Sequence, residues 1–254
     1  MNSLTYHFDL LLHLVWRDFS LRYKQSVLGV FWSLMLPLSQ LLVLTFLFQR
    51  VIPLNIDTYP AFVFSALLPW TWFNTCIGSA GTLFISNRDL VRRPNFSPAT
   101  LIVVNTLSNL INYIFAMPIL FIMLVLSGKA ITIALLSLPL LIIIQGILII
   151  GLGLIVTTLN VFYRDIQQIM SVALTLLFYL TPVFYQSQTV SESYRIIYKL
   201  NPIAVLIQGY RSIFFYGTVP DWSSLLFACM ASIGVCGLGY FIYSRYLHDV
   251  IDMI

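Results

Sequence analysis

Six long stretches without a charged residue constrain the fold of this chain more than any other feature. They are residues 25–49, 58–87, 94–128, 130–163, 166–191 and 222–244. A helix needs roughly 20 apolar residues to cross the hydrocarbon core of a membrane, so each stretch is long enough to cross. Only 9% of the residues are charged, whereas soluble domains carry about 25%. The sequence therefore predicts an integral membrane protein.

Helices are the expected spanning structure, because backbone groups in lipid must form their hydrogen bonds within the protein. A β-barrel would show short segments of alternating hydrophobicity, and the six stretches do not alternate in this way. We predict an all-α membrane protein with six transmembrane helices in a single domain over residues 1–254. Five spans fall within residues 30–191, and the sixth span with its tail occupies residues 222–254.

The first 29 residues are expected to form an amphipathic helix at the membrane interface. Apolar residues recur there at helical spacing, while charged residues lie between them. No charged start leads into an apolar core with a cleavage site, so no signal peptide is predicted. The apolar positions are Leu4, Phe8, Leu11, Leu12, Val15 and Phe19.

Residues 192–221 do not fit a span. This segment carries three cations and is interrupted by Pro202, Gly209, Gly217 and Pro220. We expect re-entrant or outer-face helices, because a charge in the middle of a membrane is costly. The alternative is a seventh span interrupted by Arg211.

The distribution of Lys and Arg predicts the orientation. With six spans both termini share one side, and cytoplasmic loops carry the excess of Lys and Arg. Eight cations against five place the two termini in the cytoplasm. The eight are Arg17, Arg22, Lys24, Arg88, Arg92, Arg93, Arg164 and Arg245, and the five are Arg50, Lys129, Arg195, Lys199 and Arg211.

The sequence offers little material for catalysis, metal binding or nucleotide binding. The three cysteines fall inside predicted spans without metal-ligand spacing, and the histidines form no cluster with them. The one Gly-Lys pair, Gly128-Lys129, lacks the Gly and the Ser or Thr that a phosphate loop requires, because Met123 and Ala130 stand there. We therefore predict no catalytic residues, no metal site and no ATP site in this chain.

Three Arg-Asp pairs lie at predicted cytoplasmic segments. They are consistent with ordinary stop-transfer charge, but three of them also suggest a docking surface for a cytoplasmic partner. The residues are Arg17, Asp18, Arg88, Asp89, Arg164 and Asp165, with Arg92 and Arg93 beside the second pair.

An ordered set of short motifs resembles the type-2 ABC transporter permeases that export bacterial surface polysaccharides such as O-antigen, capsule and teichoic acid. The resemblance covers nearly the whole chain, and the ordered set is more specific than any one motif. The motifs are Leu21-Arg22-Tyr23-Lys24-Gln25-Ser26-Val27-Leu28-Gly29 with Trp32 and Pro37, Leu68-Pro69-Trp70-Thr71-Trp72-Phe73, Asn160-Val161-Phe162-Tyr163-Arg164-Asp165-Ile166, Thr181-Pro182-Val183-Phe184-Tyr185, and Asn201-Pro202.

The resemblance implies a machine of two permeases and two separate ATP-binding subunits, which bind ATP and Mg²⁺ in place of this chain. In such permeases the N-terminal helix and the loop after the second span contact the ATPase. Here these are the segment before Lys24 and residues 87–97, and the loop containing Arg164 would be a further contact. Pro182 and Pro202 fall at the implied outer gate.

A sugar chain would require aromatic faces along its path, and an anionic lipid carrier would require a cationic edge. Packing against lipid explains the aromatic residues equally well, and ordinary positive-inside charge explains the cations equally well. The cationic candidates for a lipid headgroup are Arg22 and Lys24. The aromatic candidates are Trp70, Trp72, Phe73, Tyr179 and Tyr185.

The resulting hypothesis is a non-enzymatic, homodimeric permease subunit that exports a lipid-linked polysaccharide across a bacterial cytoplasmic membrane. A type-2 ABC permease for a drug, a lipid or another small molecule is the alternative. An intramembrane glycosyl or prenyl transferase is a third class, but this class requires clustered acidic or histidine residues that the sequence does not provide.

Overall fold

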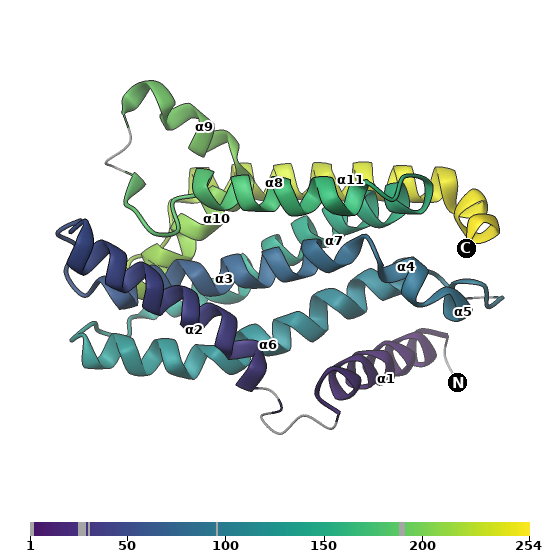
Figure 1. Cartoon of the computed structure of the whole chain (residues 1–254), viewed down its shortest axis with the longest axis horizontal. Coiled ribbons are helices and arrows are strands. Elements are labelled where there is room, and N and C mark those ends of the chain that lie inside the picture. The colour runs from purple at the N-terminus through teal and green to yellow at the C-terminus, as the bar shows by residue number, and fades with distance from the viewer. Residues whose placement is uncertain (1–2, 25–28, 30, 95, 188–190) are drawn as a thin grey trace.

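The computed structural model describes residues 3–24, 29, 31–94, 96–187 and 191–254, and this part of the chain contains helices and no strand. The longer helices run side by side as an elongated bundle (Figure 1). Short helical turns at Leu47–Val51, Ile133–Ser137, Glu192–Tyr194 and Ser212–Tyr216 adjoin the main elements. The main elements are α1 (Ser3–Tyr23), α2 (Phe31–Phe46), α3 (Tyr59–Ala80), α4 (Leu83–Ser86), α5 (Arg88–Val91), α6 (Ala99–Leu126), α7 (Leu138–Phe162), α8 (Ile166–Leu180), α9 (Arg195–Leu200), α10 (Pro202–Arg211) and α11 (Trp222–Met253).

Each of the six uncharged stretches contains one principal helix, which confirms the all-α class. By length and composition, four helical segments could cross a membrane: Phe31–Val51, Ala99–Leu126, Ile133–Phe162 and Trp222–Met253. The remaining two are α3, with 22 residues, and α8, with 15 residues. Because α8 rises only about 22 Å at 1.5 Å per residue, its crossing of a core of about 30 Å stays a prediction, as does that of α3.

The helix α3 forms the centre of the bundle. It packs against α2, α6, α7, α8 and α10, and its residues 61–70 are all buried. Apolar and small side chains occupy this segment, and the neighbouring helices cover most of the circumference of α3 there. The partly exposed positions of α3 come later in the helix, where the functional surfaces described below begin.

The two ends of the bundle carry different connections. The short helices α4 and α5 and the C-terminus lie at one end, and α9 lies at the other (Figure 1). The end with α4 and α5 contains Arg88, Arg92 and Arg93, whereas α9 contains Lys199. This grouping matches the two sets of cations in the sequence, while the side of the membrane that each end faces stays a prediction.

Residues 192–221 form short helices rather than one long one. The helices α9 and α10 contain six and ten residues, and α10 packs among α3, α7 and α11 before the chain returns into α11. Arg211 is 3% exposed at the end of α10. This arrangement favours the re-entrant interpretation over a seventh span.

The last helix begins with a side-chain cap. The carboxylate of Asp221 accepts hydrogen bonds from the hydroxyl groups of Ser223 and Ser224 at 2.6 and 2.7 Å. It also accepts one from the backbone N–H of Ser224 at 2.9 Å. These hydrogen bonds stabilise the charged carboxylate and lower the pKa of Asp221 to about 2. An N-cap of this kind fixes the start of α11.

Glycine allows α7 and α11 to approach closely. A Cβ atom on Gly151 would lie 2.6 Å from the Cα atom of Cys236, and one on Gly239 would meet the carbonyl oxygen of Gly151. No side chain fits between these backbones, which is the packing that small residues permit in membrane helices.

We predict that Gly151→Ala forces α7 and α11 apart and lowers the free energy of unfolding by about 1–3 kcal/mol, as overpacking does. Thermal unfolding of the purified protein in detergent measures the change. Gly237→Ala is the matched control, because no atom lies within 4 Å of the added Cβ. Equal stability of the two variants would contradict the close contact.

Candidate functional site

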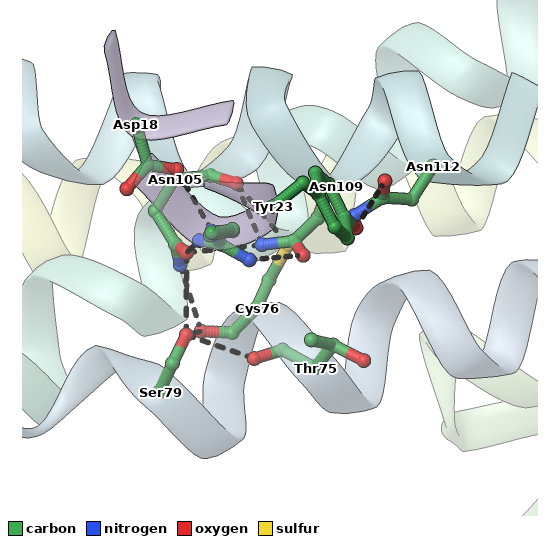
Figure 2. Close-up of polar contacts among 9 residues, drawn as sticks. Asp18, Tyr23, Thr75, Cys76, Ser79, Asn105, Asn109 and Asn112 are labelled. Carbon is green, nitrogen blue, oxygen red and sulfur yellow. Dashed lines mark hydrogen bonds and ion pairs between the residues drawn. The ribbon is translucent and has the colours of Figure 1, made fainter. Parts of the chain in front are cut away.

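A cluster of polar side chains joins the end of α1 to the middle of the bundle (Figure 2). Arg22 donates from Nη1 to Oδ1 of Asn109 at 2.9 Å and from Nη2 to Oδ1 of Asn105 at 3.1 Å. The hydroxyl of Tyr23 donates to Oδ1 of Asn112 at 2.9 Å. We call this cluster the polar junction; its members are Arg22, Tyr23, Ser79, Asn105, Asn109 and Asn112.

Asn105 is the centre of the polar junction. Its Oδ1 accepts hydrogen bonds from Arg22, from Ser79 at 3.2 Å and from Asn109 at 3.0 Å, and its amide donates to the carbonyl oxygen of Cys76 at 3.1 Å. The side chain is 3% exposed. Because a buried amide without partners costs free energy, the four contacts bind α1, α3 and α6 together at this point.

Apolar packing brings α1 to this position. Leu14 and Val15 are buried against Val104 of α6, and Phe19 stacks on Phe115 at 6.2 Å between ring centroids. A helix forms over Ser3–Tyr23 of the 29 residues for which an amphipathic helix was predicted, and apolar side chains of this helix pack along α6. Residues 25–28 of the predicted segment lie outside the described residues. Whether α1 also rests on the membrane surface stays a prediction.

The charged residues of α1 have different surroundings. Asp18 forms an ion pair with Nε of Arg22 at 3.0 Å within the helix, whereas Arg17 and Lys24, which are exposed as Arg22 is, form no ion pair with a described residue. Of the two candidates for a lipid headgroup, Arg22 is therefore the one that the structure places in an organised site.

The remaining docking candidates lie at one end of the bundle. Arg88 and Asp89 are exposed on α5, and the exposed Arg92 and Arg93 follow directly. Arg164 and Asp165 are exposed in the turn between α7 and α8, at the same end (Figure 1).

Three of the five aromatic candidates are buried within the single chain. Trp70, Trp72 and Phe73 are 3%, 3% and 2% exposed. Trp72 donates from Nε1 to the carbonyl oxygen of Thr106 at 3.1 Å, and Trp70 contacts Phe178 at 5.6 Å between centroids. In one chain these rings pack α3 against its neighbours, and their role along a channel stays a prediction.

The other two aromatic candidates lie near the end of α8. Tyr179 is 61% exposed. Tyr185 is half-buried, and its hydroxyl lies 3.0 Å from that of Tyr198. Only Tyr179 presents most of its ring outside the single chain.

An exposed polar stripe on α8 was missed by the sequence analysis. Gln168, Ser171, Thr175 and Tyr179 follow one another at intervals of three and four residues and are all exposed, so they lie on one face. The rest of the exposed surface of α8 is apolar, with Ile169, Leu176 and Leu180. We call the four residues the polar arc. Their spacing was the sequence signal that could have revealed them.

A second polar surface lies on α3. Thr71, Asn74, Thr75 and Gly78 are partly exposed at the same helical spacing. Gln167 at the start of α8 donates from Nε2 to the carbonyl oxygen of Gly78 at 2.6 Å. This contact joins the start of α8 to α3 at Gly78, whereas Thr71 and Thr75 line a pocket with α1, α2 and α6.

Beyond the end of α8, Arg211 attaches α10 to the segment that follows α8. It donates from Nη2 to the carbonyl oxygen of Val183 at 2.7 Å and from Nη1 to that of Tyr185 at 3.3 Å. Its guanidinium carbon lies 3.9 Å from the centroid of the Phe62 ring, a favourable cation–π contact. The sequence analysis did not predict that Arg211 would hold the segment after α8.

The two gate candidates frame this contact. Pro182 is buried in the segment held by Arg211, and Pro202 begins α10. The N-cap of α10 is Asn201, whose Oδ1 accepts from the backbone N–H of Ile203 at 3.2 Å. Movement of this segment as a gate stays a prediction.

Apolar helices that enclose a polar junction and expose a polar arc define an all-α integral membrane protein. Residues 9–215 match the family model described as ABC-2 type transporter. The chain is 34% identical to an O-antigen export system permease protein of Myxococcus xanthus over 226 residues, which cover 88% of this chain and 87% of that protein. It is 30% identical to a protein of the same name from Klebsiella pneumoniae, over 96% of this chain and 95% of that protein.

The chain therefore belongs to the ABC-2 type transporter family. This result confirms the resemblance stated from the motifs. It also makes the chain a transport subunit rather than an enzyme, as the sequence predicted.

We predict that Asn105→Ala destabilises the protein by about 1–3 kcal/mol, because Arg22 and Ser79 lose a buried acceptor. The measurement is thermal unfolding in detergent together with hydrogen exchange of α1, which should increase. Asn74→Ala is the control, since the partly exposed Asn74 makes no side-chain hydrogen bond to the described residues. If both variants left the exchange of α1 unchanged, the polar junction would not hold this helix.

Proposed function

We propose that this chain is the membrane-spanning permease subunit of an exporter that moves a lipid-linked, O-antigen-type polysaccharide across the bacterial inner membrane. Membership of the ABC-2 family supports a transport role. The names of the similar proteins from Myxococcus xanthus and Klebsiella pneumoniae support the substrate class. The observation that carries the proposal in this chain is the polar arc on α8.

The position of the polar arc is unfavourable in lipid. Hydroxyl and amide groups cost free energy when they leave water without a hydrogen-bond partner, and polar residues in membrane helices face a protein interior or a water-filled cavity. Thr175 donates to the carbonyl oxygen of Ser171 at 2.9 Å within α8, whereas Gln168 and Ser171 have no side-chain hydrogen bond to the described residues. The arc is exposed on the single chain, while Ile169 and Leu176 occupy the neighbouring exposed surface. We infer that the arc borders a water-filled path and that the apolar side faces lipid or another helix.

The chemistry of the arc suits a sugar polymer. The amide of Gln168 and the hydroxyl groups of Ser171 and Thr175 offer replaceable hydrogen bonds to sugar hydroxyls. The exposed ring of Tyr179 offers a flat surface to the apolar face of a sugar. None of the four side chains carries a charge at neutral pH, so a sliding polymer would meet several weak contacts and no strong one.

A path bordered by this arc requires a second copy of the chain. The arc faces outward from one bundle, so a single chain does not enclose it. Most soluble oligomers are closed and symmetric, with twofold dimers the commonest, and we extend this expectation to the permease. In such a homodimer Tyr179 would border the path, whereas Trp70, Trp72 and Phe73 would support α3 from behind.

Energy would come from two ATP-binding subunits that bind ATP and Mg²⁺. We propose that they dock at the bundle end containing α4, α5 and the turn between α7 and α8. Their contacts would be Arg88, Asp89, Arg92, Arg93, Arg164 and Asp165, with Arg17 and Asp18 on α1. This end would face the cytoplasm together with both termini.

The polar junction offers a route by which a movement of the docked ATP-binding subunits would reach the helices of the bundle. A push on α1 would reach α6 through the hydrogen bonds of Arg22 to Asn105 and Asn109, and α3 through Ser79. Rigid helices that shift at such contacts are a common form of conformational coupling. The outer segment held by Arg211 would respond at the far end.

We predict that Ser171→Leu combined with Thr175→Leu abolishes most export. Two leucines remove hydrogen bonds to sugar hydroxyls at about 0.5–1.5 kcal/mol each, and each 1.4 kcal/mol corresponds to about a tenfold effect. The measurement is surface polysaccharide in cells that lack the native chain and carry each variant, at matched membrane levels of the permease. Ala173→Leu adds similar bulk on the apolar side of α8 and should export normally.

Two outcomes would contradict the proposal at different points. Normal surface polysaccharide in cells without any copy of this chain would exclude polysaccharide export and favour a small-molecule ABC-2 permease. Normal export by the double variant, with export lost in cells lacking the chain, would exclude the polar arc as the wall of the path.

A further inference from the structure

A pocket of about 320 Å³ lies beside the polar junction, where α1, α2, α3 and α6 meet. Its volume falls in the range of ligand pockets, roughly 300–1,000 Å³. Most of the pocket surface is apolar, and its polar side chains come from all four helices, including Ser33 of α2 and Thr71 and Thr75 of α3. The residues that carry the argument are Arg22, Trp32, Leu36, Leu68, Asn112 and Ala116.

Arg22 and Asn112 supply hydrogen-bond donors to the pocket, whereas the hydroxyl groups of Thr71 and Thr75 can donate or accept. The three contacts of Arg22 with Asp18, Asn105 and Asn109 use one N–H on each guanidinium nitrogen. A second N–H on each Nη remains without a partner among the described residues. Asn112 accepts from Tyr23 through Oδ1, and its amide nitrogen donates to none of the described residues. A ligand that complements these groups must offer acceptors.

The charge of the surrounding segment also favours an acceptor with negative charge. Residues 17–24 carry Arg17, Arg22 and Lys24 against the single carboxylate of Asp18. A guanidinium with two parallel N–H groups matches the oxygens of a phosphate. Trp32, a residue that is 56% exposed, also lines the pocket.

The other wall of the pocket is apolar. Leu36 of α2, Leu68 of α3 and Ala116 of α6 line it, and Leu68 and Ala116 are 3% and 2% exposed. A free phosphate would leave this wall uncovered. A ligand that joins a phosphate to a hydrocarbon chain would cover both parts.

We propose that this pocket binds the phosphate group of a lipid, with the first carbons of the lipid tail against the apolar wall. The site lies apart from the polar arc and does not depend on which substrate is exported. Asp18 competes with the phosphate for the guanidinium of Arg22, because the carboxylate already occupies Nε at 3.0 Å. Removing the charge of Asp18 should therefore strengthen binding.

The experiment measures lipid binding to the purified, delipidated full chain in detergent. Phosphatidic acid and diacylglycerol with the same brominated acyl chains are the two probes, because bromine quenches tryptophans at close range. Trp32 and Trp72 both line the pocket. The phosphate lipid should bind at least about tenfold more tightly, as expected for hydrogen bonds to a charged group. The Trp32→Phe variant identifies the part of the quenching that arises at Trp32 in the pocket.

The variants separate the phosphate site from general adhesion of lipid. Arg22→Gln and Asn112→Ala should each reduce the preference for the phosphate lipid, and Asp18→Asn should increase it. Asn112→Ala guards against a folding effect, because Asn112 has one hydrogen bond in the polar junction and Arg22 has two. Arg17→Gln is the matched control, since Arg17 is exposed on the same helix and does not line the pocket.

Competition identifies the source of the phosphate. Displacement of the brominated probe by a polyprenyl phosphate, but only weakly by unlabelled phosphatidic acid, would assign the site to a lipid carrier. The reverse order would assign the site to a bilayer lipid. Displacement of the probe by inorganic phosphate, but by neither of the two lipids, would contradict a lipid site. Equal binding of the two probes, or a preference that survives both Arg22→Gln and Asn112→Ala, would overturn the proposal. Because no transport is measured, these outcomes are independent of the proposed polysaccharide substrate.

Discussion

A polar side chain among apolar helices needs a hydrogen-bond partner inside the protein, and the hydrogen bonds of Asn105 meet this requirement. Its amide group pairs with side chains from α1, α3 and α6 and with a backbone carbonyl of α3. Lipid tails are as apolar as leucine, so the hydrophobic effect does not drive helices together within a membrane, and packing and hydrogen bonds must hold them. Hydrogen bonds have a fixed geometry, so the polar junction determines where α1 sits on the bundle.

The same requirement explains how α7 is attached to α3. Gln145 donates to the carbonyl oxygen of Pro69 at 2.8 Å, Thr157 to that of Ala80 at 2.9 Å, and Asn160 to that of Gly81 at 2.8 Å. Each donor side chain is buried. The contacts are spaced along α3, so α3 and α7 are expected to move as one body. The polar arc of α8 is the contrasting case. Thr175 donates only to the carbonyl oxygen of Ser171 in the same helix, at 2.9 Å, and no arc side chain forms a hydrogen bond to another helix within the described residues. The arc therefore indicates the surface where water or another copy is required.

The fold was largely predictable, because charge and length alone determine where helices can cross a membrane. The positions of Arg88 and Arg164 at one end followed from the spacing of the stretches. The polar arc was readable from the spacing of Ser171 and Thr175 with their neighbours, although it was not recognised. The partners of Arg22 were not predictable, since Asn105 lies 83 residues away and only tertiary packing brings the two together. The burial of Trp72 was equally hidden, because an aromatic ring suits a channel wall, lipid and a helix contact alike.

The account depends most on the claim that the two exposed sides of α8 face different media. Ser171→Cys and Ala173→Cys place a thiol on each side, and both positions are exposed on the single chain. In a background where Cys76, Cys229 and Cys236 are replaced, a water-soluble maleimide would be applied to the assembled exporter in membranes. Because the thiolate is the reactive form and requires water, we predict labelling at position 171 at least about tenfold faster than at position 173. Equal rates at the two positions would contradict a water-filled path along the polar arc.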